Sequence, residues 1–237
     1  MKRTGLIALV ALLFGAAALR DGVDTWIAET DLPATLAETS VEVRDRNGTL
    51  LRPYTVGNGV WRLAPTLAAV DQTFLEMLIR YEDKRFRTHP GVDPLAMLRA
   101  AFQAVRNGRT ISGGSTLSMQ VARILHPHRR TLAGKLQQLL RTLQLEWQLS
   151  KSEILTLYLN LAPFGGTVEG VQAASYSYLN KPASALTDAE AALLAVLPQA
   201  PSRLRPDRYP ERAQRARDKV LNRLATLQIW PEQRVAE

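Results

Sequence analysis

Hydrophobic and polar residues alternate along this 237-residue chain mainly at the spacing of α-helices. From about residue 67 onward, apolar residues return every three or four positions, the period that places them on one side of a helix. The clearest stripe follows i, i+3, i+4, i+7 and i+11 and consists of Leu136, Leu139, Leu140, Leu143 and Trp147. We expect this stripe to face a core, and the whole pattern predicts a mainly α-helical domain.

Capping signals indicate where several of these helices begin. Asp93-Pro94 predicts an N-cap followed by proline at the first helical position, for a helix that runs to about Arg106. Gly113-Gly114 opens another helix, which ends near His126-Pro127. Two S/T-x-x-E sequences predict capping boxes before apolar runs, and they are Ser150 with Glu153 and Thr187 with Glu190.

A different pattern precedes the helices. Val41 and Val43 alternate with polar residues up to Asn47-Gly48, and an Asn-Gly pair between extended segments is typical of a short hairpin. We therefore expect a small β element near residues 40–62. The predicted organisation is a connector and small β element at 21–62, a helical domain at 63–230 and the start of a linker at 231–237.

Residues 1–20 carry the signals of a segment that enters a membrane. Lys2 and Arg3 precede an uncharged run from Thr4 to Leu19, which as a helix is roughly 24 Å long, short of the ~30 Å hydrocarbon layer. One interpretation is a secretory signal cleaved near the small residues at 16–18. Another is a short anchor with the basic residues on the cytoplasmic side. A buried core helix is the third, and the terminal position and basic flank argue against it.

Composition narrows the chemistry. The chain has no cysteine, which excludes disulfides, zinc–thiolate sites and thiol nucleophiles. Its net charge is +8 and its isoelectric point is about 10.1, a balance that attracts nucleic acid, anionic lipid headgroups or pyrophosphates alike. Export of the domain disfavours nucleic acid, and the sequence has no recognisable nucleic-acid-binding motif. A basic run from Arg203 to Arg223 fits either lipid headgroups or a solvated helix face.

The first candidate site is the stretch YEDKRFRTHPGVDP at residues 81–94. It places Glu82 beside Asp83 at the end of an amphipathic segment. Adjacent carboxylates repel each other, which raises one pKa and suits a general base or acid. Arg85 and Arg87 add positive charge next to the pair. Taken alone, the same pattern is also typical of a solvated helix end.

The second candidate site is the stretch ISGGSTLSMQVAR at residues 111–123. Ser115 and Thr116 follow two glycines at a helix start, where free backbone N–H groups and hydroxyls form an anion site. No lysine follows at the spacing of a Walker loop, and a plain loop-to-helix junction is the alternative. His126 and His128 flank a proline, but two ligands without a third favour a loop over a metal site.

Four segments, taken in order, resemble the motifs of one enzyme family. They read EDKRFRTHPGVD, GGSTLSMQVAR, LSKSEILTLYLNLAPFGGTVEGVQAASYSYL and LTDAEAALLAVLPQAPSRLRP. They are similar to the successive motifs of the family 51 peptidoglycan glycosyltransferases, over roughly residues 40–230. Within the family the chain looks most like the penicillin-binding protein 1C subgroup. The resemblance implies a mainly α, lysozyme-like domain with a small flexible lobe that dips toward the membrane.

The resemblance also implies roles for individual residues. Glu82 would be the catalytic base, which takes the proton from the sugar 4-hydroxyl of an incoming lipid-linked disaccharide, lipid II. That oxygen attacks C1 of the growing chain and displaces undecaprenyl pyrophosphate with inversion. The residues implied to shape the loop around Glu82 are Asp83, Phe86, His89 and Gly91. The residues implied to line the donor pocket are Gly113, Gly114, Ser115, Thr116 and Gln120.

The chain departs from the family at two positions. Arg123 stands where the family usually has lysine, so the charge is kept while the geometry differs. In the third motif Lys135 is retained for pyrophosphate, but the family's second glutamate is replaced by Gln138, three positions along the same helix face. Either that carboxylate is dispensable in this subgroup, which we favour, or the enzyme is slow. We expect no required cofactor and regard a divalent cation, Mg²⁺ or Mn²⁺, as optional.

The implied partners are lipid II, the growing glycan chain, the membrane and other cell-wall synthesis proteins, without nucleic acid. The implied location is the cytoplasmic membrane, with the catalytic domain on the periplasmic side. Two alternatives stay open: a lytic, lysozyme-like hydrolase that shares the scaffold and one catalytic glutamate, and an inactive membrane-anchored scaffold, which only Gln138 supports. The sequence lacks the Ser-x-x-Lys and Lys-Thr-Gly motifs of a penicillin-binding transpeptidase.

Overall fold

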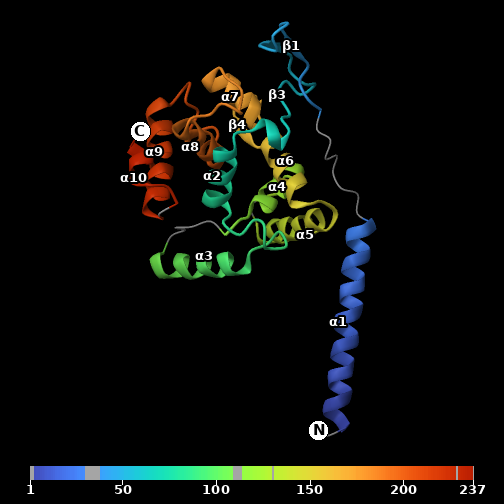
Figure 1. The fold of residues 1–237 in the computed structure, drawn as a ribbon. Helices are drawn as coiled ribbons and strands as arrows, with labels where there is room; N and C mark the ends of the chain where they lie inside the picture. The colour runs from blue at the N-terminus through green and yellow to red at the C-terminus, as the bar shows by residue number, and fades with distance from the viewer. Residues whose placement is uncertain (1–2, 30–37, 109–113, 130, 228, 237) are drawn as a thin grey trace. The chain divides into compact units, whose positions relative to one another are not determined.

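The structure is a computed structural model that describes residues 3–29, 38–108, 114–129, 131–227 and 229–236. The chain divides into two units, Met1–Ala34 and Thr35–Glu237, and each is described by itself. Figure 1 gives the order of the elements along the chain.

The first unit is a single long helix, α1 (Arg3–Glu29). Its stretch Gly5–Thr25 has a mean hydropathy of 1.9 and is long and apolar enough to cross a membrane, as an anchor or a secretory signal would. The helix continues past residue 20, where the sequence suggested that the connector begins. Two contacts one turn apart accompany this extension: Arg20 pairs with Asp24 at 3.5 Å, and the Thr25 hydroxyl donates to the carbonyl oxygen of residue 21.

Two small sheets accompany the helices of the second unit. β1 (Glu42–Arg44) pairs antiparallel with β2 (Leu50–Pro53), and the Asp45 carboxylate accepts hydrogen bonds from two backbone N–H groups within the turn. This hairpin confirms the prediction made from Asn47-Gly48. The second sheet joins distant segments, because β3 (Trp61–Arg62) lies parallel to β5 (Val168–Glu169), which pairs antiparallel with β4 (Pro163–Gly165).

Helices make up most of the second unit and confirm the mainly α prediction. The α-helices are α2 (Gln72–Glu82), α3 (Pro94–Asn107), α4 (Leu117–Leu125), α5 (Leu132–Gln148), α6 (Lys151–Leu161), α7 (Val171–Leu179), α8 (Asp188–Val196), α9 (Pro210–Thr226) and α10 (Glu232–Ala236). Two 3₁₀ turns, η1 (Leu67–Ala69) and η2 (Leu197–Gln199), complete the set. α10 occupies the segment from which the sequence suggested a linker.

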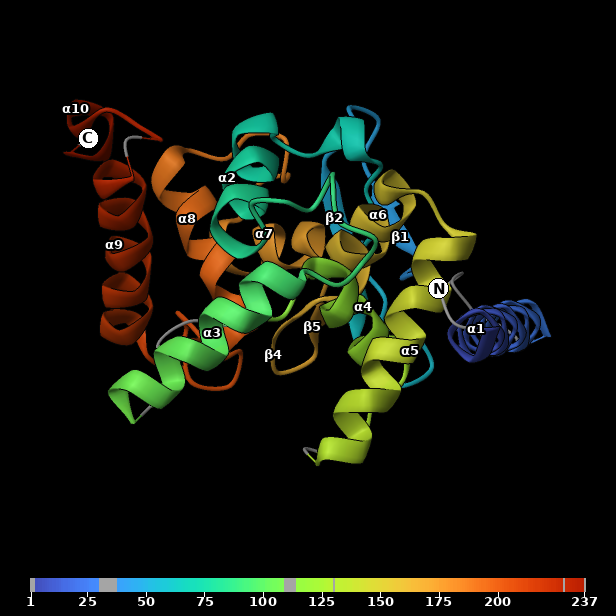
Figure 2. The ribbon, with the colours of Figure 1, turned by 90° about the horizontal axis from the view of Figure 1, so that it is seen from below.

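The core forms where α4 packs against α5 and α6, and where α8 packs against α2 and α9. In both ribbon views α4 lies inside the domain, and its Met119 and Val121 are fully buried (Figures 1 and 2). The predicted caps are present: the Asp93 side chain accepts from the Ala96 N–H at the start of α3, and both capping boxes form. These caps satisfy backbone donors that the first helical turn leaves free.

The prediction that the leucine stripe of α5 faces the core is wrong. Leu136 is 58% exposed and Trp147 is 64% exposed. The buried face of α5 instead carries Leu145 together with four small or polar residues, Gly134, Gln138, Thr142 and Gln144. Gly134 is required locally, because an added Cβ would lie 2.1 Å from the carbonyl oxygen of Arg129, in the segment just before α5. Gln138 ties this face to α4, since its amide nitrogen donates to the Met119 carbonyl oxygen, and hydrogen bonding outweighs apolar character at this contact.

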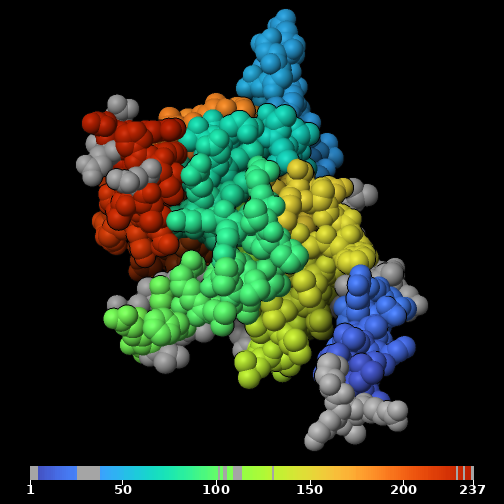
Figure 3. All heavy atoms as spheres, turned by 60° about the horizontal axis from the view of Figure 1, so that its bottom comes forward, coloured from blue at the N-terminus to red at the C-terminus, as the bar shows by residue number. Residues whose placement is uncertain are grey.

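Apolar side chains are also exposed on α3. Leu95, Leu98 and Phe102 follow one helical stripe and are each more than 60% exposed. On α5, Leu132 is 92% exposed, in addition to the stripe just described. Figure 3 shows the face of the domain from which α3 and α5 project. These two helices give the domain an exposed apolar surface, which we call the α3–α5 apolar surface.

Candidate active site

Glu82 is the last residue of α2, and its partly buried carboxylate is held by two glutamine amides. The Gln199 Nε2 donates to Oε1 at 2.5 Å, and the Gln120 Nε2 donates to Oε2 at 3.1 Å. Burial raises the pKa of Glu82 above its ordinary value, since desolvation penalises the charged form. The two amide hydrogen bonds oppose this rise, the Asp83 charge adds to it, and the Arg223 charge opposes it. A carboxylate with a raised pKa is suited to accept a proton near neutral pH.

Asp83 points away from solvent and organises the loop that follows Glu82. One of its carboxylate oxygens accepts from the backbone N–H of Leu117 at 3.0 Å, at the start of α4. The His89 Nδ1 accepts from the Gly91 N–H at 3.1 Å, so its Nε2 carries the proton and donates to Asp83 at 2.9 Å. Both side chains are less than 8% exposed. Asp83 and His89 therefore fix the loop between α2 and α3, and Asp83 holds it against the start of α4.

The remaining residues of the first motif are packed as tightly. Phe86 is buried, and the Lys151 ammonium lies 4.9 Å from the centre of its ring. Gly91 has a φ of +87°, and its carbonyl oxygen accepts from the Thr116 hydroxyl at 2.5 Å. Thr116 also caps α4, since its side chain accepts from the Met119 N–H. The loop, α4 and α6 are thus joined by contacts of the first two motifs.

A second group of polar side chains lies along α4 and α5. The Lys135 Nζ donates to the Ser115 hydroxyl at 3.2 Å and to the Gln138 amide oxygen at 3.0 Å. Burial lowers the pKa of Lys135, and the charge of Arg123 lowers it further, so these two cations lie close to each other. The Gln138 amide nitrogen donates to the Met119 carbonyl oxygen at 2.5 Å, which ties α5 to α4 next to Gln120.

The structure therefore brings most of the predicted site residues together around α4. Glu82 contacts the α4 residue Gln120, and Lys135 lies with Gln138 against the same helix. Gly114 packs against α3, where an added Cβ would lie 3.1 Å from the Met97 Cα. Gly113 lies outside the described residues. The catalytic and binding roles of these residues stay predictions.

Comparison with known proteins decides the family. Residues 47–225 match the family model described as Transglycosylase, which is most of the chain. The chain belongs to the transglycosylase family. This membership confirms the resemblance to the family 51 peptidoglycan glycosyltransferases.

Curated relatives of this transglycosylase are penicillin-binding proteins. Penicillin-binding protein 1C of Escherichia coli K12 is 57% identical over 81% of this chain and 25% of its own length. Penicillin-binding protein 1A of Pseudomonas aeruginosa is 37% identical over 82% of this chain and 23% of its own length. A crystal structure of penicillin-binding protein 1A from Haemophilus influenzae matches 84% of this chain with a TM-score of 0.45 and 22% identity. The chain spans about a quarter of the length of these relatives.

Two residues that contact or face Glu82 in the transglycosylase domain were missed by the sequence analysis. Gln199 donates directly to Glu82 although 117 positions separate them. Arg223, from α9, lies over the Tyr81 ring at 5.7 Å and contributes positive charge at Glu82. The sequence offered one signal for Gln199, because in the segment LPQAP this polar residue lies between two prolines, directly after an apolar helical run. Arg223 had none beyond its place in a basic run.

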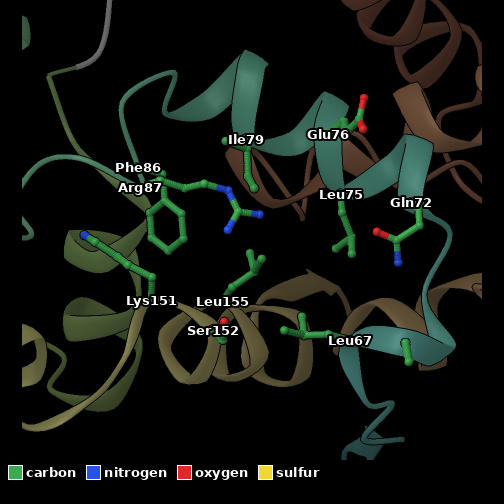
Figure 4. Close-up of a pocket in the computed structure, with 11 residues that line it drawn as sticks. Leu67, Gln72, Leu75, Glu76, Ile79, Phe86, Arg87, Lys151, Ser152 and Leu155 are labelled. Carbon is green, nitrogen blue, oxygen red and sulfur yellow. The ribbon is translucent and has the colours of Figure 1, made fainter.

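A cavity of about 240 Å³ lies beside α2, and Phe86 of the first motif is among the residues that line it. Figure 4 shows Leu75 and Ile79 of α2 facing Leu155 of α6 across it, with the Arg87 guanidinium between Phe86 and these side chains. Neither Glu82 nor any predicted donor-pocket residue lines it.

Proposed function

We propose that this transglycosylase domain polymerises lipid II into glycan strands, with Glu82 as the general base. The observation that carries the proposal is the state of Glu82: its pKa is raised by burial, and its two oxygens accept amide hydrogen bonds. Each carboxylate oxygen has a second lone pair, which is free to accept the hydrogen bond of a sugar hydroxyl. The 4-hydroxyl of an incoming disaccharide would bind here and lose its proton as its oxygen attacks C1 of the donor.

The leaving group of this reaction is a pyrophosphate, and Lys135 and Arg123 would bind it. A pyrophosphate is a good leaving group that needs charge stabilisation rather than a strong acid. Among the described residues, Lys135 has neutral hydrogen-bond partners, Ser115 and Gln138, rather than a carboxylate. No carboxylate of the described part of the chain pairs with its positive charge, which is available to an anion.

We propose that the reaction does not require a divalent cation. Gln138 occupies the position at which the family has its second glutamate, and both ends of its amide are engaged, with Lys135 and with the Met119 carbonyl. The described residues include no cluster of three or more histidine or carboxylate side chains that would hold a metal ion. Gln138 therefore supplies no carboxylate through which Mg²⁺ or Mn²⁺ would be held beside the pyrophosphate. We expect polymerisation to continue in EDTA.

The exposed apolar residues suit a substrate that is embedded in a membrane. Leu95, Leu98 and Phe102 on α3 would enter the boundary between headgroups and acyl chains, as amphipathic helices at membrane interfaces do. We propose that the α3–α5 apolar surface contacts the outer leaflet of the cytoplasmic membrane. The lipid-linked substrate would then reach the site without leaving the bilayer.

The decisive experiment is a polymerisation assay with purified full-length chain and lipid II, alongside the Glu82→Gln variant. This substitution keeps the size of the side chain and removes its ability to accept a proton. We expect the loss of a general base to lower the rate at least about 100-fold. Equal activity in the parent and the variant would refute the role of Glu82. Release of soluble fragments from cell-wall sacculi, without polymer from lipid II, would instead identify a lytic enzyme.

A further inference from the structure

Gln199 reaches Glu82 from a rigid part of the fold. It ends the 3₁₀ turn η2, which follows α8 directly, and the preceding Leu197 is fully buried. The Ala200 N–H donates to the Leu197 carbonyl oxygen and closes the turn. Because α8 packs against α2, the backbone of Gln199 is fixed relative to the end of α2 that carries Glu82. The side chain itself is exposed, so it does not contribute to the core.

The two amides that contact Glu82 come from two different elements, α4 and η2, and donate to different oxygens. Gln120 on α4 contacts Oε2, and Gln199 on η2 contacts Oε1. A carboxylate held at one oxygen only is able to rotate about its Cγ–Cδ bond, whereas two donors fix both the plane and the direction of its lone pairs. The positions of the Gln120 and Gln199 amides therefore determine the direction of the remaining lone pairs on the Glu82 carboxylate.

We propose that Gln199 is a positioning residue which, together with Gln120, fixes the Glu82 carboxylate in the orientation that accepts the proton of the acceptor sugar. The proposal rests on the proposed function of Glu82 as general base. Gln199 acts through Glu82, and the proposal assigns it no contact with the substrate.

The other groups that face Glu82 cannot replace these two amides. Asp83 raises the pKa of Glu82 and Arg223 lowers it, each through its charge. The Tyr158 hydroxyl, on α6, is fully buried and its own pKa is raised, first by burial and then by the Glu82 charge, with Arg123 opposing. Among the described residues, only the two amides donate a hydrogen bond to the carboxylate. Removing Gln199 leaves Oε1 without its donor, which favours the protonated form.

Two substitutions test the proposal in the full-length chain in detergent. Gln199→Leu removes the donor at nearly constant size. Gln199→Glu keeps size and shape but brings a second carboxyl group against Glu82, so that the pair shares one proton. Gln72→Leu is the matched control, because Gln72 is also exposed and its Nε2 also makes one hydrogen bond, to the Val70 carbonyl oxygen. Circular dichroism reports whether each variant keeps its helices.

Two measurements are made on each variant. The first is the pH dependence of kcat and KM for lipid II polymerisation. The second is the pKa of Glu82 by ¹³C NMR of side-chain-labelled glutamate, with Glu82→Gln to assign the signal. For Gln199→Leu we expect the acidic limb and the NMR pKa to rise together by about one pH unit, and kcat to fall about tenfold with little change in KM. For Gln199→Glu we expect a larger rise, and for Gln72→Leu none.

An unchanged acidic limb and NMR pKa in both Gln199 variants would overturn the proposal, as would an equal shift in the Gln72→Leu control. A rise in KM at constant kcat would also overturn it, because it would assign Gln199 to substrate binding. The NMR readout does not depend on catalysis. A parent chain that fails to polymerise lipid II, while its Glu82 pKa still responds to Gln199→Leu, would refute the proposed function and the role of Gln199 in proton transfer, and would leave only the contact between Gln199 and Glu82.

Discussion

Gly91 lies where the loop after Glu82 packs most closely against α5. Its φ is +87°, a left-handed conformation that side chains with a Cβ adopt at a cost of about 1–2 kcal/mol. A Cβ at this position would lie 2.5 Å from the Glu146 Cγ and 2.9 Å from the Thr142 Cγ2. Forcing an extra methyl group into a packed contact costs about 1–3 kcal/mol more. We therefore expect Gly91→Ala to lower the free energy of unfolding by about 3 kcal/mol.

Gly48 provides a matched control for this substitution. It has a similar φ, +82°, but an added Cβ there would meet no atom within 4 Å. Gly48→Ala should therefore lose only the strain, about 1 kcal/mol. The assay is urea unfolding of the parent and both variants in detergent, followed by near-ultraviolet circular dichroism. The difference between the two losses, about 2 kcal/mol, isolates the collision with α5. Losses that agree within about 0.5 kcal/mol would refute the packing argument.

Asp93 and Lys135 offer two simpler tests. Burial alone would raise the pKa of Asp93, but hydrogen bonds from the Ala96 N–H and Arg85 outweigh burial and lower this pKa. The ionised Asp93 carboxylate therefore stabilises the fold fully at pH values above its pKa in the unfolded chain. This stabilisation is lost as the pH falls through the pKa of Asp93 in the folded protein. Asp93→Asn keeps the N-cap, and it should lower the free energy of unfolding by about 1 kcal/mol at pH 7 and by almost nothing near pH ~2. Equal losses in urea unfolding at the two pH values would contradict this pH dependence. Lys135→Gln should raise KM for lipid II about tenfold or more, whereas Lys219→Gln at an exposed site of α9 should leave it unchanged. An unchanged KM in the Lys135 variant would remove this residue from the donor pocket.

Local signals in the sequence predicted the parts of the fold that depend on neighbouring residues. The cap of α3 at Asp93 and the hairpin turn at Asn47-Gly48 are set by side chains within a few positions of the backbone groups they satisfy. The second sheet lacked such a signal, because its strands are two or three residues long and β3 pairs with β5 across more than 100 positions.

Hydrophobic periodicity predicted the wrong buried face for α5. α5 carries an apolar stripe and a face of small and polar residues, and hydrophobicity alone selects the stripe for the core. The structure buries the other face, on which Gln138 hydrogen-bonds to the Met119 carbonyl oxygen of α4. The exposed stripe then becomes a surface that the proposed membrane contact would use.

Some residues of the candidate site were assigned from the sequence, and others were found only in the structure. The resemblance of the motifs to a known family assigned Glu82 and Lys135, and the structure places both against α4, directly or through Gln138. Gln199 had no such assignment, since its contact with Glu82 arises only when α8 packs on α2. Contacts of this kind depend on tertiary structure that the local sequence does not encode.

Three bonds connect the loop after Glu82 to α4 and α6, in addition to bonds within the loop such as that from His89 to Asp83. The Asp83 carboxylate accepts a hydrogen bond from the Leu117 N–H, and the Gly91 carbonyl oxygen accepts one from the Thr116 hydroxyl. The Lys151 ammonium donates to the His89 carbonyl oxygen. Each of these contacts closes a long stretch of chain, which is entropically costly and forms late during folding. Turnover should consequently appear only in the last kinetic phase of refolding, after helical circular dichroism has recovered, so that catalysis serves as a sensitive reporter of the complete native state.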